Sequence, residues 1–354
     1  MPQADRWDLL VRRDDLGASE VRQAPAPRLQ PGEVDLAVEK FALTSNNATY
    51  ARLGEFFWNA FPGPEGYGRV PVWGVARVVD SRHPDIAVGG RYFGYLPMST
   101  HHVVAPERTA WGFTDTSPQR DFMHGWYRSY RLAEESDGLD DRRTLIRPIY
   151  PASFNLAGFL ARQASLGVRS VVITSASSKT AIGLADRLSR GSELSTFALT
   201  SPRNTAFVAR LGLYDTVVPY DEFASVAITP PIVLVDFTGD TKRLTALHER
   251  FAGELSHTAL VGYTHPEAVV VQPEMPGPKP EIFFTPAVEE QTMAEEGEDA
   301  YRARYEAAEE QFVETTASWL TVRHRRGPEA IADAFASLLT GEQPPDVSHV
   351  FSPR

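Results

Sequence analysis

The chain has 354 residues, a net charge of −11 and no cysteine, with 42% hydrophobic and 23% charged residues. The length favours two domains, and the missing cysteines exclude disulfides, thiolate catalysis and cysteine-ligated zinc. The acidic balance disfavours nucleic acid and anionic membranes as partners, so we expect a small-molecule substrate. No apolar run approaches the roughly 20 residues that cross a bilayer, and the first residues do not resemble a signal sequence, so we expect a cytoplasmic protein without membrane segments.

Residues 1–148 are predicted to form a β domain. EVDLAVEKFAL alternates between apolar and polar residues, and VPVWGVARVVDS, GGRYFGYLP and THHVVAP follow as strands between turn signals. His101 and His102 point to opposite faces of such a strand, which makes them a poor metal pair. Residues 113–147 are polar and irregular, and AEESDGLDDRR within them is expected to be an exposed loop.

Residues 149–272 alternate between strand and helix patterns. The apolar runs SVVITS, LSTFALTS and PPIVLVDFTG are separated by the helical segments TAIGLADRLSR and RNTAFVARLGL, and TKRLTALHERFAG follows as another helix. Continuous apolar strands between helices indicate parallel strands that are covered on both faces. We therefore predict an α/β fold whose second domain is a doubly wound parallel sheet.

Residues 273–354 are predicted to complete this sheet and to return to the first domain. The charged stretch over 288–320 has apolar residues at helical spacing and predicts one long helix. GPEAIADAFASLLTG predicts another amphipathic helix that ends at Gly341. The basic residues 323–326 are interpreted as the solvated entrance to that helix.

The turn after the first parallel strand is the main candidate for a ligand site. A dinucleotide-binding turn uses three glycines, for the tight bend, for close approach of the pyrophosphate and for helix packing. Here it reads SASSKTA, so that Ala176 stands for the first glycine, Lys179 replaces the middle one and Ala181 takes the packing position. The Lys179 ammonium, the neighbouring hydroxyls and the helix amides offer donors to an anion. The same segment is equally compatible with a plain connection in which the hydroxyls only cap the helix.

The second parallel strand ends in FALTSPRN, which places Thr200, Ser201 and Arg203 where an adenosine ribose is recognised. No acidic residue stands there to accept a hydrogen bond from a free 2′-hydroxyl. Hydroxyls with an arginine suit a 2′-phosphate, so the pattern favours NADPH over NADH. Arg203 is alternatively a solvated residue at the start of the next helix.

The order of these segments resembles the medium-chain dehydrogenase/reductase superfamily, in particular its zinc-free branch of quinone oxidoreductase-like and enoyl reductase-like proteins. VVITSASSKTAIGLA is similar to that family's VLVTGASGGVGLAA, and PGEVDLAVEKFALTSNNATYARLG is similar to its GEVLVRVKAVGLNFIDTYIRSG. EIFFTPAVEEQ resembles its SLFVTRPSL. The resemblance implies a GroES-like β domain over 1–148, a Rossmann-type nucleotide-binding domain over 149–272 and a C-terminal segment over 273–354.

The resemblance also implies the members of an NADPH site. DTVVPYDE places Tyr220 on the family's ribose-side tyrosine, and IVLVDFTGD and HTALVGY resemble the strands beside the nicotinamide. Phe283 and its two successors fall on the segment that borders the nicotinamide. The expected cofactor-binding residues are Ser175, Ala176, Ser177, Ser178, Lys179, Thr180, Thr200, Ser201, Arg203, Tyr220, Phe237, Thr238, Gly262, Tyr263, Phe284 and Thr285.

Hydride transfer to a conjugated acceptor needs orientation and a donor for the developing enolate, without a metal or a covalent residue. The resemblance places Ser45 on the family's asparagine and Tyr50 on the tyrosine of quinone reductases, so we expect Tyr50, Ser45 and Asn46 to be catalytic. The cysteines and the Gly-His-Glu motif of the zinc branch are absent, so we expect no metal. Tyr50 is alternatively a packed aromatic residue, Asn46 is alternatively a turn former, and His265 is a further candidate at a strand end.

The sequence thus predicts an NADPH-dependent, zinc-free reductase of a quinone or an α,β-unsaturated carbonyl, expected as a homodimer. Two alternatives stay open. Lys179 blocks the dinucleotide in the first, which leaves a lyase, dehydratase or isomerase on the same fold. The second is a scaffold without catalysis, because a fold does not by itself fix a function.

Overall fold

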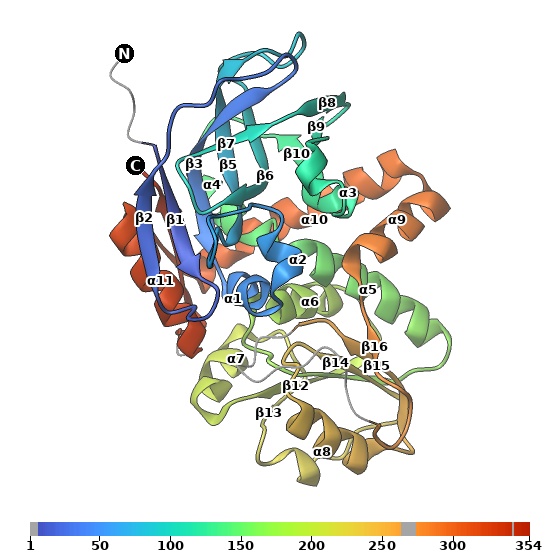
Figure 1. Cartoon of the computed structure of the whole chain (residues 1–354). Coiled ribbons are helices and arrows are strands. Elements are labelled where there is room, and N and C mark those ends of the chain that lie inside the picture. Colours follow the sequence, from blue (N-terminus) through green and yellow to red (C-terminus); the bar gives the residue numbers. More distant parts are fainter. Residues whose placement is uncertain (1–5, 263–273, 342) are drawn as a thin grey trace. The chain divides into compact units, whose positions relative to one another are not determined.

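Figure 1 shows the computed structural model of the chain, which describes residues 6–262, 274–341 and 343–354. The chain divides into two units. The first comprises residues 1–145, 321–343 and 347–354, and the second comprises residues 146–320 and 344–346.

The first unit is built mainly on antiparallel strands. These are β1 (Trp7–Arg12), β2 (Ser19–Gln23), β3 (Val34–Leu43), β4 (Tyr67–Gly68), β5 (Pro71–Ser81), β6 (Arg91–Pro97), β7 (His101–Val104), β8 (Pro106–Thr109), β9 (Gly112–Asp115), β10 (Ser129–Leu132), β17 (Thr321–Arg326) and β18 (Val347–Ser352). The main sheet has the order β17-β18-β3-β5-β6-β10-β9-β8, with β7 also paired to β3, and a small sheet has the order β2-β1-β4. Because β18 pairs with β3, residues that follow the second unit complete the sheet of the first.

Short helices accompany this sheet. They are α1 (Ser45–Arg52), α2 (Glu55–Trp58), α3 (Gly125–Arg128), α4 (Asp140–Ile146) and α11 (Pro328–Thr340). The predicted end of α11 is confirmed, because Gly341 follows it with the left-handed φ of 71° that favours glycine. Ile331 and Phe335 of α11 pack into the same core as the apolar face of β3.

The second unit holds a parallel sheet. Its strands are β11 (Ser170–Ile173), β12 (Ser195–Thr200), β13 (Thr216–Pro219), β14 (Ile232–Asp236), β15 (Leu255–Leu260) and β16 (Glu281–Ile282). They lie in the order β13-β12-β11-β14-β15-β16, and every neighbouring pair is parallel. This is a doubly wound order. Successive strands are added on one side of β11 as far as β13, and then on its other side from β14 onwards. The predicted fold class, a β domain with a doubly wound parallel sheet, is confirmed.

Helices cover both faces of this sheet (Figure 1). They are α5 (Tyr150–Ser165), α6 (Lys179–Ser189), α7 (Thr205–Leu211) and α8 (Thr241–Phe251). Two further helices, α9 (Thr285–Glu296) and α10 (Glu298–Thr315), pack against α5. Val171 and Ile173 of β11 contact the cluster that includes α5 and α6, whereas Val172 contacts the cluster that includes α8. Both faces of β11 are thus apolar, which explains its continuous run of β-branched residues.

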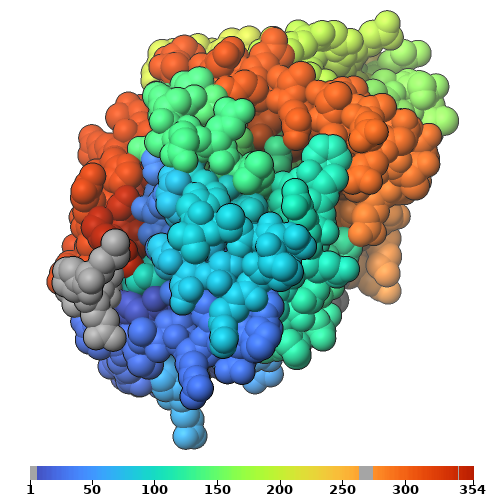
Figure 2. Space-filling view, turned by 90° about the horizontal axis from the view of Figure 1, so that it is seen from above, coloured from blue at the N-terminus to red at the C-terminus, as the bar shows by residue number. Residues whose placement is uncertain are grey.

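Two sequence-based assignments in the C-terminal part are wrong. The single helix expected over 288–320 is two helices, α9 and α10, because Gly297 between them has a φ of 92° that interrupts helical geometry. Both helices lie at the surface and are orange in Figure 2. Residues 323–326 belong to strand β17 and are not a helix entrance, since they pair in parallel with β18.

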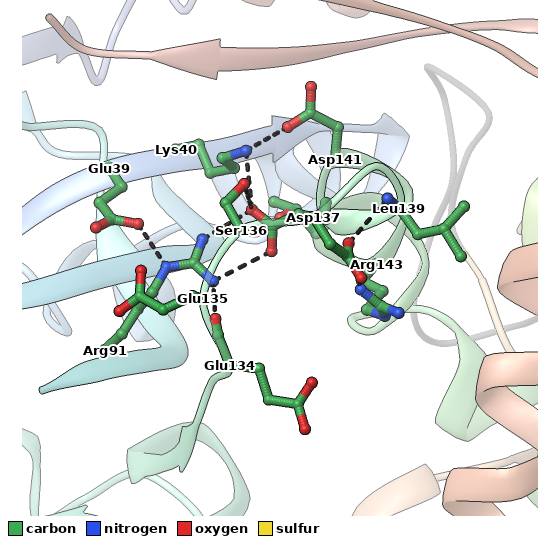
Figure 3. Close-up of polar contacts among 12 residues, drawn as sticks. Glu39, Lys40, Arg91, Glu134, Glu135, Ser136, Asp137, Leu139, Asp141 and Arg143 are labelled. Carbon is green, nitrogen blue, oxygen red and sulfur yellow. Dashed lines mark hydrogen bonds and ion pairs between the residues drawn. The ribbon is translucent and has the colours of Figure 1, made fainter.

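The segment expected to be an exposed acidic loop is partly buried. Asp140 begins α4 and is only 6% exposed. Its carboxylate pairs with Arg91 at 2.7 Å and with Lys40 at 2.9 Å. Figure 3 shows Arg91, which also pairs with Glu39 at 2.6 Å. Sequence reasoning missed this network because its cations come from β3 and β6, far away in the chain.

Across the described residues, no helix is both long enough and apolar enough to cross a membrane.

Candidate functional site

The turn after β11 is bent at Ser175, which has a φ of 48°. This left-handed conformation is the one that a first glycine would supply, so the bend lies one residue before Ala176, where the sequence analysis placed it. The Ser178 amide donates to the Ser175 carbonyl at 2.7 Å and closes the turn. Ala176 is fully buried, and its amide donates to the carbonyl of Leu199 in β12.

Helix α6 begins directly after this turn. The Ser178 hydroxyl caps it by accepting from the Ala181 amide at 3.3 Å. Ala181, which the sequence analysis expects in the packing position, is fully buried in the core. The close helix approach falls two residues later, since a Cβ on Gly183 would lie 2.8 Å from the Ser153 hydroxyl. Thr180 is held from the same side, because its carbonyl accepts from Ser153.

Lys179 is the first residue of α6 and is partly buried. Its ammonium donates to the Pro345 carbonyl at 3.5 Å, and Asp346 lies near enough to stabilise the charge. Burial outweighs that attraction and lowers the pKa of Lys179 to about 8. The ammonium is therefore a weakly held cation at a helix N-terminus, where an anion is favoured.

Hydroxyl groups gather at the carboxyl end of β12. The Ser177 hydroxyl accepts from the Asn204 side chain at 3.0 Å and from Thr200 at 3.5 Å. The Ser201 hydroxyl oxygen is buried and has no hydrogen-bond partner within residues 6–262, 274–341 and 343–354. An unpartnered buried hydroxyl here fits a ligand with a polar edge, such as a ribose. Arg203 is exposed on the turn that follows.

Tyr220 connects two parts of this edge. Its hydroxyl accepts from the Ser175 amide at 2.6 Å, and its own amide donates to the Thr200 carbonyl at 3.0 Å. The guanidinium carbon of Arg243, in the first turn of α8, lies 3.7 Å from the centre of the Tyr220 ring. Sequence reasoning missed Arg243, because only the folded sheet brings α8 to the residue after β13.

The switch point of the sheet lies between β11 and β14. Asp236 ends β14 and is buried there, and its carboxylate accepts from Thr174 at 2.6 Å, from Thr238 at 2.8 Å and from the Gly239 amide at 2.8 Å. Burial raises the pKa of Asp236 above its usual range, although these bonds act against that shift. The arrangement holds the loop that contains Phe237 and Thr238, and it too was missed in the sequence.

The predicted nicotinamide side is described in part. Phe237 and Thr238 are buried, and a Cβ on Gly262 would lie 2.8 Å from the Phe237 carbonyl, so a glycine is required there. Phe284 is 44% exposed and Thr285 begins α9. Tyr263 and His265 lie outside the described residues.

In the first unit, Tyr50 lies on α1 and is 5% exposed. Its hydroxyl oxygen accepts from the Asn46 side chain at 2.8 Å and from the Trp73 indole at 3.1 Å. The structure thus brings Asn46 and Tyr50 together, whereas Ser45 is exposed at the start of the helix. Burial raises the pKa of Tyr50, so the phenol is protonated at neutral pH and keeps its own hydrogen for donation.

A ring cluster surrounds this hydroxyl. Phe57, Phe61 and Tyr95 lie 4.5 to 5.6 Å from a neighbour in the cluster, measured between ring centres. Of the aromatic residues that follow α1, Phe57, Trp58 and Phe61 are buried and Phe56 is 46% exposed. The Tyr50 phenol therefore accepts two hydrogen bonds inside an aromatic environment.

Solved structures share this fold. The chain is similar to CurA from Vibrio vulnificus in complex with NADPH, with 14% identity, a TM-score of 0.59, and 98% of this chain and 99% of that chain covered. It is similar to the quinone oxidoreductase from Coxiella burnetii, with 13% identity, a TM-score of 0.54, and 99% and 100% covered. The yhdH oxidoreductase from Salmonella enterica in complex with NADP gives 14% identity, a TM-score of 0.54, and 98% and 100% covered. At these identities the likeness establishes the fold.

The comparison with curated proteins found no match. Residues 41–344 match the family model described as "Protein of unknown function (DUF2855)", which spans most of the chain. The chain belongs to the DUF2855 family.

Proposed function

We propose that this protein is an NADPH-dependent, zinc-free oxidoreductase of the medium-chain dehydrogenase/reductase superfamily. In this proposal it transfers hydride to a quinone or to an α,β-unsaturated carbonyl. The observation that carries the proposal is the hydroxyl-rich carboxyl edge of the parallel sheet, where the buried Ser201 hydroxyl has no partner among the described residues and Arg243 stacks on Tyr220. The NADPH and NADP complexes of CurA and yhdH, which share the fold, support it.

The residues of the second unit fit a dinucleotide phosphate. The α6 N-terminus and Lys179 offer positive charge to the pyrophosphate, and Ser201, Arg203 and Arg243 offer donors to a 2′-phosphate. Such local cations are needed because the chain as a whole carries a charge of −11. Bound NADPH supplies the hydride, which is a proton with two electrons.

The residues of the first unit act on the acceptor in this proposal. When hydride adds to the conjugated carbon, an electron pair moves to the carbonyl oxygen, which becomes an enolate or phenolate oxygen. The Tyr50 hydroxyl donates a hydrogen bond to that oxygen, and Asn46 and Trp73 hold the phenol in place. A proton from water then completes the reduced product.

We also propose a homodimer that forms through the edge strand β16. Ile282 on this strand is 56% exposed, and the nearby Phe284 is 44% exposed. Among the described strands, β16 pairs with β15 alone and stands at the end of the strand order. An exposed apolar edge of this kind favours pairing with a second chain.

One observation favours the non-redox alternative. Lys179, the residue that replaces the middle glycine, donates to the chain's own carbonyl at Pro345. While this contact is kept, the ammonium is less available to a pyrophosphate. A fold that does not bind the dinucleotide would then serve lyase, dehydratase or isomerase chemistry.

A measurement of NADPH consumption distinguishes the proposed reductase from the non-redox alternative. The purified protein is mixed with NADPH and with either 1,4-benzoquinone or 2-cyclohexenone, and oxidation of the cofactor is followed by absorbance. The proposal predicts turnover with at least one acceptor and a loss of roughly 10- to 1000-fold in kcat for Tyr50→Phe. Tyr67→Phe is the control, because Tyr67 lies on β4, outside the ring cluster. Absence of turnover with every quinone and enone tested would contradict the reductase.

A further inference from the structure

Tyr95 carries a buried hydroxyl that the proposed reaction has not used. It lies on β6, directly opposite Trp73 of β5, and it is 0% exposed. Its hydroxyl oxygen is buried and has no hydrogen-bond partner among the described residues. A buried hydroxyl without a partner costs free energy, so such a group in a native core needs a reason.

The neighbouring phenol of Tyr130 shows what a purely structural tyrosine does in this core. Tyr130 is also buried, and its hydroxyl donates to the Tyr95 backbone carbonyl at 2.5 Å. Within the same group of strands, the Tyr130 hydroxyl has a hydrogen-bond acceptor, whereas the Tyr95 hydroxyl has no partner among the described residues.

The Tyr95 hydroxyl belongs to a group of three phenols. The Tyr95 ring meets the Tyr50 ring edge-on at 5.6 Å and the Tyr127 ring at 5.4 Å. Burial raises the pKa of Tyr95, and the nearby phenols of Tyr50 and Tyr127 raise it further. Tyr50 already accepts two hydrogen bonds, so its proton is free to donate. Both O–H groups lie in one apolar cluster and neither donates to an acceptor in the described part of the chain, so they fit a ligand oxygen.

Aromatic rings lead from the surface to these phenols. Phe122 and Phe56, each 46% exposed, meet edge-on at 5.4 Å. Phe56 meets Phe57 at 5.1 Å, and Phe57 meets Tyr50 at 4.5 Å. Tyr127 borders this path from α3, a single turn in which no residue is fully buried. Tyr127 packs on the ring cluster but stays partly exposed, and a row of rings favours a flat, conjugated ligand.

We propose that Tyr95 and Tyr50 together form a two-donor site for one oxygen of a flat, ring-conjugated carbonyl compound. The inference rests on the proposed function for the reaction, in which the oxygen gains the electron pair displaced by hydride. Tyr95 donates a hydrogen bond to that oxygen, and no bond to the tyrosine forms or breaks in the step. Both donors strengthen as negative charge develops, which places them with the groups that stabilise an oxyanion.

The test uses 4-nitrophenolate, an aromatic oxyanion whose absorbance reports binding, and it is made without any cofactor. The wild-type protein binds the probe, and Tyr95→Phe and Tyr50→Phe each weaken binding by about tenfold or more, because each removes a hydrogen bond to a charged oxygen. Tyr92→Phe is the matched control, since Tyr92 lies on the same strand β6 but packs into a different core cluster. Its affinity stays at the wild-type value.

A second readout separates a ligand donor from a packing residue. Tyr95→Phe removes a hydroxyl that has no partner, so its melting temperature is expected to equal or exceed that of the wild type while its affinity falls. The proposal is overturned if Tyr95→Phe binds 4-nitrophenolate as tightly as the wild type, or if the wild type does not bind it. If the probe results hold but NADPH is never oxidised, the proposed function fails and the two-donor site stands.

Discussion

The pKa of Lys179 makes the charge of the nucleotide turn depend on pH. Burial lowers that pKa to about 8, so the free protein loses the ammonium charge as the pH rises through this value. A bound phosphate raises the pKa again, so NADPH affinity is full below pH 8 and falls above it, by up to about tenfold per pH unit. Isothermal titration at several pH values between 7 and 9 measures this.

The control for that profile is Lys179→Arg, because arginine keeps its charge throughout the range. Its affinity for NADPH is expected to stay flat between pH 7 and 9. Equal slopes for the variant and the wild type would show that Lys179 does not contact the phosphate. In that case its contact with Pro345 is its role.

Arg243 is expected to select the 2′-phosphate. Arg243→Gln removes the guanidinium that stacks on Tyr220, so the dissociation constant for NADPH rises by roughly tenfold while that for NADH is unchanged. Arg250→Gln is the matched control on the same helix, since Arg250 lies over Phe251 and donates to the carbonyls of Ala224 and Val226. An unchanged ratio of the two dissociation constants in Arg243→Gln would remove this residue from the ribose site.

Some of the candidate site residues could be predicted from the sequence, and others could not. Ser175, Lys179 and Thr200 could be singled out because a strand, a turn and a helix follow one another in the chain. Arg243 and Tyr95 could not, because only the folded chain brings Arg243 of α8 onto the Tyr220 ring and buries the Tyr95 hydroxyl without a partner among the described residues. Asn46 was singled out together with Ser45, and only the helical geometry of α1 separates them, since Asn46 and Tyr50 are four residues apart on one face.

At the level of elements, the pairing of β3 with β5 depends on Gly74. A Cβ at this position would lie 2.2 Å from the Lys40 carbonyl and 2.7 Å from the Phe41 Cβ. The paired backbone of β3 cannot move away without a loss of stability. Gly74→Ala is therefore expected to lower the free energy of unfolding by about 1–3 kcal/mol in urea titration. Gly138→Ala is the control, because nothing lies within 4 Å of a Cβ there, and similar losses in both variants would argue against the predicted clash.

The attachment of α4 depends on the charge of Asp140. Burial alone would raise its pKa, but the bonds from Arg91 and Lys40 outweigh burial and lower it to about 2. Because the folded pKa is below the unfolded value of about 4, the stabilisation is present above pH 4 and is lost as the pH falls towards 2. Asp140→Asn is expected to cost about 3–5 kcal/mol at pH 7, and this difference shrinks below pH 4.

Glu135→Gln serves as the control within the same network, because the Glu135 side chain is 78% exposed beside Arg77. A surface pair of this kind contributes little, so its melting temperature is expected to match that of the wild type. A pH-independent effect of Asp140→Asn would point to lost packing rather than lost charge.

The elements themselves were predictable where local pattern and tertiary environment agree. The strands β11, β12 and β14 follow from apolar runs that are buried on both faces, and α11 follows from its spacing and from Gly341. The prediction of one long helix over 288–320 was wrong, because Gly297 has a left-handed φ that ends helical geometry although the apolar spacing continues on both sides of it. The prediction that the acidic segment is exposed was wrong, because Lys40 and Arg91, which pair with its Asp140, are distant in sequence.

At the scale of the whole molecule, the edge strand β16 is the place where the proposed dimer can be tested. Ile282→Glu puts a charge on a side chain that is 56% exposed at that edge. It is expected to convert the dimer to a monomer in light scattering, without changing the melting temperature by more than a few degrees at low concentration. A wild-type protein that is monomeric at every concentration would contradict the dimer.

The central claim is that the carboxyl edge of the parallel sheet binds NADPH. The most direct measurement is a titration of the wild-type protein with NADPH and with NADH, followed by nicotinamide fluorescence and by melting temperature. We predict that NADPH binds and raises the melting temperature, and that NADH binds at least about tenfold more weakly. Binding of neither cofactor would contradict the claim, and it would leave the Lys179 turn as a connection held by the chain's own carbonyl at Pro345.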